Sequence, residues 1–132
     1  VPVLLGQLLS PLQATPSLFL MAVCVIVIAF GMVLEGLPAA VVLVPVVFPI
    51  AKQIGIHPIH FNIVLTAAVG IGLFLPPIGV GLLMALRFAD ISVGRHFRVY
   101  WPYLVALFVG LIILIAFPEI TLFLPRRAGM VR

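Results

Sequence analysis

The stretch Gly70–Gly81 reads GIGLFLPPIGVG and places four glycines and two adjacent prolines inside a long apolar run. Pro76 and Pro77 have no backbone N–H. The carbonyls of Gly72 and Leu73 therefore lose their helical partners. In lipid, broken backbone persists only where protein or a water-filled cavity satisfies the freed polar groups. We expect a discontinuous membrane helix here that forms part of a binding site; a proline kink that only shapes packing is the alternative.

The composition indicates an all-α integral membrane protein. The chain has 132 residues, of which 65% are hydrophobic and 8% are charged, whereas about a quarter of the residues of a soluble domain are charged. Val99–Pro118 is a run of 20 uncharged residues, which as a helix of about 30 Å matches the thickness of a bilayer core. The formal charge of +4 comes from scattered residues, so nucleic acid is a poor candidate partner.

Two uncharged segments on either side of Glu35–Pro38 predict a helical hairpin over Leu18–Ala51, with its second helix starting at Pro38. Two geometries remain open, namely two full spans or a re-entrant pair whose tip stops inside the membrane. A buried tip would point the N–H groups of Ala39 and Ala40 into the protein. Such a helix start suits a carboxylate, because its donors are unpaired and its dipole end is positive.

The rest of the chain is divided by composition. We expect a polar connection over Gly55–Asn62, the broken helix over Ile63–Arg87, a short amphipathic arm helix at the membrane interface over Ala89–Tyr100, and the last transmembrane helix over residues 101–117. Pro118 and Glu119 end that helix, and a tail with Arg126, Arg127 and Arg132 follows. The chain begins at Val1 in sequence that is already apolar, and we interpret residues 1–132 as one membrane domain of a larger protein.

Few side chains in the sequence are candidates for a binding or catalytic role. Glu35 is either an intramembrane carboxylate or a hydrated one at the interface, and both readings stay open. Thr66 is expected to bond back to its own helix, and Asp90 to cap or pair near the interfacial helix. Cys24 lies in an apolar run and is interpreted as a packing residue.

His57 and His60 have the spacing of a metal-binding pair, but no acid or thiol nearby supplies a third ligand. We interpret them as loop histidines and expect no metal beyond Na⁺. No Ser-His-Asp or Cys-His set can be assembled from three acids, one cysteine and three histidines. The glycines of Gly70–Gly81 also lack the lysine of a phosphate-binding loop. We therefore expect a protein that is not an enzyme and has no organic cofactor.

Several motifs occur in a fixed order between Ser17 and Arg126: G-x-x-x-E, P-x-x-x-P, H-F, PP-x-G and LPR. This set resembles the C-terminal part of the large membrane (permease, DctM-type) subunit of tripartite ATP-independent periplasmic (TRAP) transporters. The resemblance implies a secondary transporter of the bacterial inner membrane, with inverted repeats and an elevator-like motion. Such a transporter imports organic acids such as C4-dicarboxylates with Na⁺ as coupling ion. Its partners would be a small TRAP membrane subunit and a periplasmic substrate-binding protein.

The resemblance also carries over candidate site residues. Those at the hairpin tip are Gly31, Glu35, Gly36 and Pro38, and those at the helix break are Pro76, Pro77 and Gly79. The residues themselves add Ala39 at the expected helix start, and the carbonyls of Gly72 and Leu73 as possible Na⁺ ligands at the break. We expect tip and break to face each other in the protein interior.

Two positions depart from the family's pattern. Leu75 stands where a threonine is frequent, so a hydroxyl ligand for the ion would be missing. Cys24 stands where an asparagine is frequent, one to two turns before Gly31. The alternatives to this reading are a permease of another ion-coupled anion transporter family and a membrane assembly subunit that does not transport.

Overall fold

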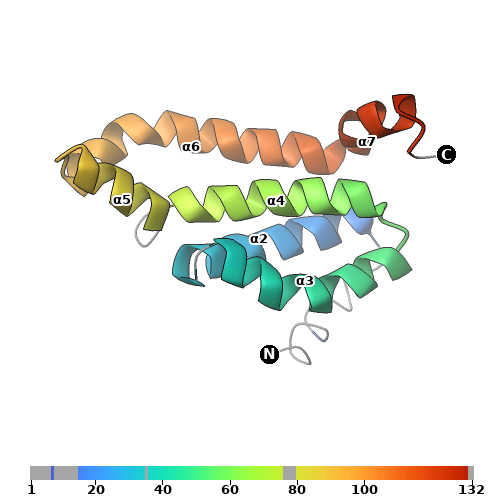
Figure 1. Ribbon diagram of the computed structural model, residues 1–132. Helices are drawn as coiled ribbons and strands as arrows, with labels where there is room; N and C mark the ends of the chain where they lie inside the picture. Colours follow the sequence, from blue (N-terminus) through green and yellow to red (C-terminus); the bar gives the residue numbers. More distant parts are fainter. Residues whose placement is uncertain (1–6, 8–14, 35, 76–79, 131–132) are drawn as a thin grey trace.

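The computed structural model describes residue 7 and residues 15–34, 36–75 and 80–130. Within these residues it contains helices and no strands. The helices are α2 (Pro16–Leu34), α3 (Gly36–Gln53), α4 (Pro58–Phe74), α5 (Val80–Phe88), α6 (Val93–Ala116) and α7 (Pro118–Arg127). In Figure 1, α4 runs between α6 on one side and the pair α2 and α3 on the other. By length and composition α2, α3 and most of α6 could cross a membrane.

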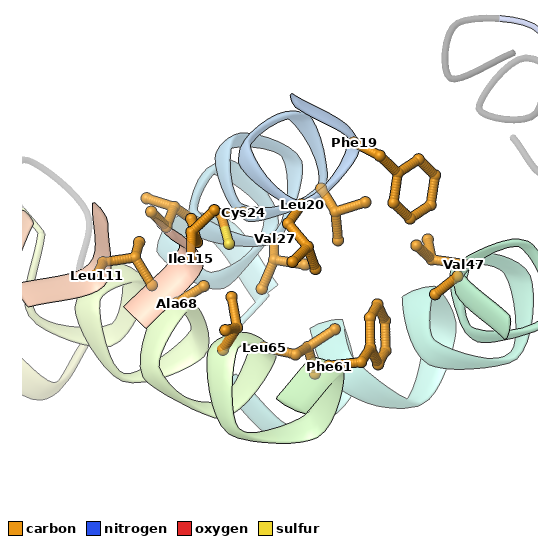
Figure 2. Packing of buried hydrophobic residues seen from close by; sticks show 14 of the residues in the cluster. Phe19, Leu20, Cys24, Val27, Val47, Phe61, Leu65, Ala68, Leu111 and Ile115 are labelled. Atoms are coloured by element: carbon orange, nitrogen blue, oxygen red, sulfur yellow. The ribbon is translucent and has the colours of Figure 1, made fainter. Parts of the chain in front are cut away.

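The core forms where α2, α3 and α4 meet. Each of these helices buries residues three or four positions apart, which lie on one face of a helix. On α2 and α4 they are Phe19, Leu20, Val23, Cys24, Val27, Ile28, Gly31, His60, Phe61, Val64, Leu65, Ala68, Ile71 and Gly72. Figure 2 shows the side chains of Phe19 and Phe61 near Val47 of α3, and Leu111 and Ile115 of α6 at the opposite side of this cluster. Cys24 is buried here as a packing residue, as the sequence predicts.

The expected hairpin corresponds to α2 and α3, which lie side by side with the start of α2 and the end of α3 at the same end (Figure 1). The second helix begins at Gly36 rather than at Pro38. Proline is compatible with any place in the first turn, because the N–H groups there have no intrahelical acceptor. The prediction that Ala39 and Ala40 carry the unpaired N–H groups was therefore wrong, and these donors belong to Gly36 and Leu37.

The broken helix is confirmed, since α4 ends at Phe74 and a new helix, α5, begins at Val80. Leu75, the residue before the double proline, has an extended backbone with φ −81° and ψ 124°, as expected for a residue that precedes proline. Figure 1 shows α5 continuing beyond the end of α4. Pro76, Pro77 and Gly79 lie outside the described residues.

The helix α4 begins at Pro58, five residues before the expected start at Ile63. His57 is its N-cap, and its Nδ1 accepts a hydrogen bond from the backbone N–H of Ile59 at 3.2 Å. Pro58 then occupies the first helical position, where its missing N–H costs nothing. The interpretation of His57 and His60 as loop histidines was therefore wrong, because one caps α4 and the other lies in its first turn.

The prediction of a separate arm helix over Ala89–Tyr100 was also wrong. Residues 93–116 form one continuous helix, α6, which includes the expected last span and passes through Pro102. The change from charged to apolar residues was read as a boundary between two elements. A helix that passes from water into lipid needs the same change in composition without any break in its backbone.

The tail after the last span contains a helix, α7, over Pro118–Arg127. Pro118 is at its first position and Glu119 is in its first turn, while Arg126 and Arg127 lie in its last turn. This charge order complements the helix dipole. The salt bridge between Glu119 and Arg126 adds little, because both side chains are largely exposed.

Three helices end with the same backbone motif. At the end of α5 the N–H of Ile91 donates to the carbonyl of Leu86 at 3.1 Å, and the N–H of Asp90 donates to the carbonyl of Arg87 at 3.3 Å. These are the two bonds of a Schellman motif, which requires a left-handed residue. Glycine fills that position after α3 (Gly55, φ 85°) and after α7 (Gly129, φ 70°), but after α5 it is Asp90, with φ 52°. Asp90 thus caps through its backbone, at the end of α5.

Replacing Asp90 by glycine should stabilise the protein by about 1 kcal/mol, because a residue with a Cβ is strained in the left-handed region. The opposite change, Gly55→Ala, should destabilise it by a similar amount. Both are measured as unfolding midpoints of the full-length protein in detergent. A lower midpoint for Asp90→Gly would contradict this account of the end of α5.

Candidate functional site

The helices α2 and α4 touch backbone to backbone near their C-terminal ends. A Cβ built on Gly72 of α4 would lie 2.9 Å from the carbonyl oxygen of Ile28 and 3.2 Å from the Cα of Gly31, both on α2. A Cβ on Gly31 would in turn lie 3.5 Å from the Cα of Gly72. Only glycine permits this approach at position 72, since the atoms in the way belong to a backbone that cannot rotate aside.

The start of α3 lies against α4 one turn before Gly72. A Cβ on Gly36 would lie 2.6 Å from Cγ1 of Val69. Three residues further on, Ala39 is completely buried, whereas Leu37 is 81% exposed. The first turn of α3 therefore has a side that faces the other helices and a side that is open.

The C-terminal end of α4 has several carbonyl groups at the break. The carbonyl of Gly72 has no helical donor at position 76, because proline lacks an N–H, and it accepts a hydrogen bond from the N–H of Leu75 at 3.3 Å instead. A carbonyl has two lone pairs and can accept a second bond. The first turn of α5 lies against the next carbonyl, because a Cβ on Gly81 would lie 3.3 Å from the oxygen of Leu73.

Tyr100 contributes a contact that sequence reasoning missed. Its hydroxyl group donates to the carbonyl of Phe74, the last residue of α4, at 3.1 Å. Its position beside Trp101 and Tyr103 is typical of an aromatic belt at a membrane interface. The available signal was the hydroxyl itself, because a tyrosine near a helix end whose carbonyls lack donors is a candidate cap.

The described residues thus bring together part of the predicted site. Gly31, Gly36, Ala39 and Gly72 are buried, and Leu73 is half-buried. Pro38 is exposed. Glu35, Pro76, Pro77 and Gly79 lie outside the described residues. The start of α3 and the end of α4 therefore lie at one place, with helix donors and helix acceptors near each other.

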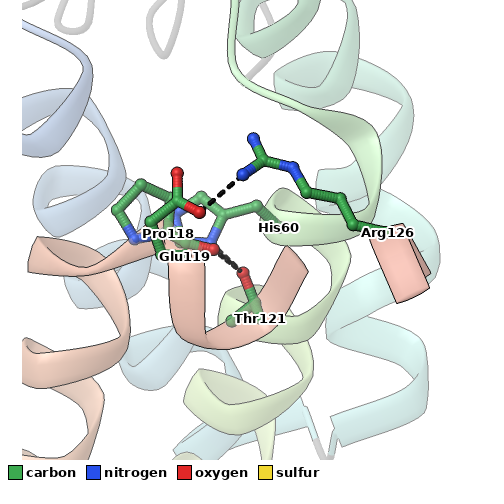
Figure 3. A network of polar contacts seen from close by, with 5 residues as sticks. All are labelled: His60, Pro118, Glu119, Thr121 and Arg126. Carbon is green, nitrogen blue, oxygen red and sulfur yellow. Dashed lines mark hydrogen bonds and ion pairs between the residues drawn. The ribbon is translucent and has the colours of Figure 1, made fainter. Parts of the chain in front are cut away.

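A second polar cluster lies at the other end of α4. His60 is 4% exposed, and its Nδ1 is 2.8 Å from the hydroxyl oxygen of Thr121. That hydroxyl group donates its proton to the carbonyl of Pro118 at 2.8 Å, so it accepts from the Nδ1–H of His60. Figure 3 shows this contact beside the Glu119–Arg126 pair. The cluster fastens α7 to α4.

This histidine cluster does not resemble a metal centre. Among the described residues no group of three histidine, cysteine or acidic side chains could hold a metal ion. A cavity of about 260 Å³ borders the cluster and is lined by His57, His60 and Glu119 among others. Its lining residues His57 and His60 lie at the start of α4, at the end opposite the break, so the cavity is separate from the site between α3 and α4.

The described helices, with a broken helix beside a hairpin tip, define an all-α, multi-pass integral membrane protein. The family model described as "Tripartite ATP-independent periplasmic transporter, DctM component" matches residues 1–120. The chain therefore belongs to this family, the large permeases of TRAP transporters, which lie in the bacterial inner membrane.

Curated relatives agree with this assignment. The chain is 32% identical over 98% of its length to the C4-dicarboxylate TRAP transporter large permease protein DctM of Pseudomonas aeruginosa. It is 31% identical over 91% of its length to the 2,3-diketo-L-gulonate TRAP transporter large permease protein YiaN of Escherichia coli. It is also 31% identical over 95% of its length to the sialic acid TRAP transporter large permease protein SiaM of Vibrio cholerae.

The chain covers 30%, 28% and 29% of the length of these three relatives, respectively. No solved structure matches the chain.

Gly72→Ala should destabilise the full-length permease by about 1–3 kcal/mol, because the new methyl group must push α2 and α4 apart. The matched control is Gly70→Ala on the same helix, where a Cβ meets nothing within 4 Å. The control should be neutral or slightly stabilising. The measurement is the unfolding midpoint of each variant in detergent, and equal midpoints for the two would refute the close backbone contact.

Thr121→Val should destabilise the permease by about 1–3 kcal/mol, because it leaves the buried Nδ1–H of His60 without an acceptor. Thr66→Val is the matched control. Its hydroxyl group is exposed and donates to the carbonyl of Asn62 at 2.7 Å within the same helix, as the sequence predicts. Thr66→Val should change stability by less than about 0.5 kcal/mol. If the two variants unfold at the same temperature, the polar cluster does not fasten α7.

Proposed function

We propose that this chain forms one half of the substrate and ion site of a Na⁺-coupled TRAP permease that imports small organic anions such as C4-dicarboxylates. The observation that carries the proposal is the contact between the start of α3 and the end of α4, where a Cβ on Gly36 would reach Val69 at 2.6 Å. No other place in the described residues combines a helix start with a broken helix.

The two helix ends offer complementary chemistry. The start of α3 presents the N–H groups of Gly36 and Leu37 and the positive end of a helix dipole, which favour a carboxylate. The end of α4 presents carbonyl oxygens and the negative end of a dipole, which favour a cation such as Na⁺. The carbonyls of Gly72 and Leu73 are the proposed Na⁺ ligands.

The proximity of these ends supplies a reason for coupled binding. Opposite unit charges about 5 Å apart attract each other by roughly 3 kcal/mol at an effective dielectric constant of about 20. A bound Na⁺ would therefore raise the affinity for the anion, and the anion would raise the affinity for Na⁺ by the same factor. This reciprocity is what a symporter requires.

The names of the relatives support an anionic substrate. They mention C4-dicarboxylate, 2,3-diketo-L-gulonate and sialic acid. These molecules differ in size and shape but each carries a carboxylate. The backbone N–H groups of a helix start can bind that shared carboxylate. Side chains around the rest of the substrate would then determine which anion is transported.

The departures at Leu75 and Cys24 restrict how Na⁺ would be held. Leu75 supplies no hydroxyl group and contributes only its backbone, whose N–H donates to the carbonyl of Gly72. Cys24 is buried in the core two turns before Gly31. We therefore propose a Na⁺ site made from backbone carbonyls rather than from these two side chains.

The remaining features of the transport cycle are proposed from family membership. The permease would work with a small membrane subunit and with a periplasmic binding protein that delivers the anion. The α2–α3 hairpin and the α4–α5 broken helix would move together through the membrane as an elevator. The core of buried residues that α2, α3 and α4 share, to which α6 adds Leu111 and Ile115, supports a rigid unit of the hairpin with α4.

The test uses the full-length permease with its small subunit and binding protein in proteoliposomes, and radiolabelled succinate as the probe. We expect an inward Na⁺ gradient to drive accumulation and an equal K⁺ gradient to drive none. Accumulation that is equal with both cations would refute Na⁺ coupling.

The same assay tests the site. Gly36→Val should reduce Na⁺-driven uptake at least about tenfold, because its side chain displaces the start of α3 from Val69. Gly94→Val is the matched control, since a Cβ there meets nothing within 4 Å, and it should retain uptake. Both variants should insert into the membrane in equal amounts. Normal uptake by Gly36→Val would contradict the proposed site.

A further inference from the structure

The end of α4 is held by a residue from a different helix. Tyr100 lies in the second turn of α6, 26 positions after Phe74 in sequence, and its hydroxyl group donates to the carbonyl of Phe74 at 3.1 Å. Phe74 is the last residue of α4. The last carbonyls of a helix have no intrahelical donor, so this hydroxyl group supplies a donor where the broken helix leaves one missing.

The tyrosine ring has limited freedom. The ring of His96, one turn earlier on α6, stacks on it with 5.1 Å between centroids and an interplanar angle of 27°. The ring is also half-buried. A side chain held in this way loses less conformational entropy when it makes a hydrogen bond than a freely rotating side chain does.

Among the described residues, two hydrogen bonds therefore hold the end of α4. The first comes from the C-cap of α4 itself, where the N–H of Leu75 donates to the carbonyl of Gly72. The second comes from α6, where the hydroxyl group of Tyr100 donates to the carbonyl of Phe74. Leu73 lies between these two carbonyls, so the orientation of its peptide group is constrained on both sides.

We propose that Tyr100 is a positioning residue for the cation site, because it holds the carbonyls of Gly72 and Leu73 in the orientation that binds Na⁺. The inference rests on the proposed function, since it needs a Na⁺ site at this helix end. Tyr100 itself does not touch the ion. It acts through the backbone of Phe74, one residue beyond Leu73.

Loss of the hydroxyl group should weaken Na⁺ binding without removing it. Tyr100→Phe keeps the ring and its stacking on His96 but removes the donor. A hydrogen bond of ordinary net strength corresponds to about a two- to tenfold change in an equilibrium constant. The Na⁺ concentration that gives half-maximal effect should rise by that factor.

The experiment measures the unfolding midpoint of the purified full-length permease as NaCl replaces KCl at constant ionic strength. Because a ligand that binds the folded state raises the midpoint, the titration gives the half-saturating Na⁺ concentration. Tyr103→Phe is the matched control. It removes a hydroxyl group from the same helix, and within the described residues the hydroxyl of Tyr103 makes no hydrogen bond.

We expect Tyr100→Phe to shift the Na⁺ titration to higher concentration and Tyr103→Phe to titrate as the wild type does. A wild-type titration with Na⁺ dependence and an unshifted Tyr100→Phe curve would overturn this inference and leave the proposed function standing. Tyr100→Phe could instead lower the unfolding midpoint equally at every Na⁺ concentration and leave the half-saturating Na⁺ concentration unchanged. That result would show a purely structural role for Tyr100 and would also overturn the inference. A wild type that does not respond to Na⁺ would overturn both.

Discussion

The backbone contact between Gly31 and Gly72 fixes the positions of most other parts of the fold. It brings α2 so close to α4 that a methyl group on Gly72 would lie 2.9 Å from the carbonyl oxygen of Ile28. From this point α2 has three residues left before it ends at Leu34, and α4 has two before it ends at Phe74. The hairpin tip and the helix break therefore lie at the same level. The next helix, α3, then starts at Gly36 against Val69.

Such a contact is suited to a membrane. Lipid tails are as apolar as leucine side chains, so burial of apolar surface contributes little to helix association, and close packing of small residues contributes more. The buried faces of α2 and α4 add the interlocking side chains seen in Figure 2. The opposite end of α4 is fastened by the His60–Thr121 contact. The helix α4 is thus fastened near both of its ends, to α2 at Gly72 and to α7 at His60.

Much of the fold could be predicted because it follows from local backbone chemistry. The double proline at Pro76 and Pro77 implies the end of α4, and the uncharged segments on either side of Glu35 imply the α2–α3 hairpin. Composition was misleading for α6, because the transition from Arg98 to the apolar residues that follow reflects a change of surroundings rather than a change of element. The start of α3 was misplaced because proline is tolerated anywhere in a first turn.

The long-range contacts could not be predicted in this way. The hydroxyl group of Tyr100 marks it as a possible donor, but the sequence does not identify Phe74 as the acceptor, since the pairing depends on how α6 packs along α4. The same is true of Thr121 and His60, which are 61 residues apart. Of the predicted site, Gly31, Gly36, Ala39 and Gly72 do gather in the interior. The role of these residues in binding Na⁺ and an organic anion remains our proposal.

Cysteine cross-linking tests whether the hairpin tip docks on the end of α4. In the full-length permease, with Cys24 and any other cysteines replaced by alanine, Gly36→Cys is paired with Val69→Cys. Because a Cβ at position 36 reaches the side chain at position 69, the pair is within the range of a disulfide, whose Cβ atoms are about 3.8 Å apart. We expect the 36–69 pair to form a disulfide rapidly in native membranes under mild oxidation. We expect no disulfide between positions 37 and 69 when Leu37→Cys replaces Gly36→Cys. Failure of the 36–69 pair to cross-link in a folded, inserted permease would contradict it.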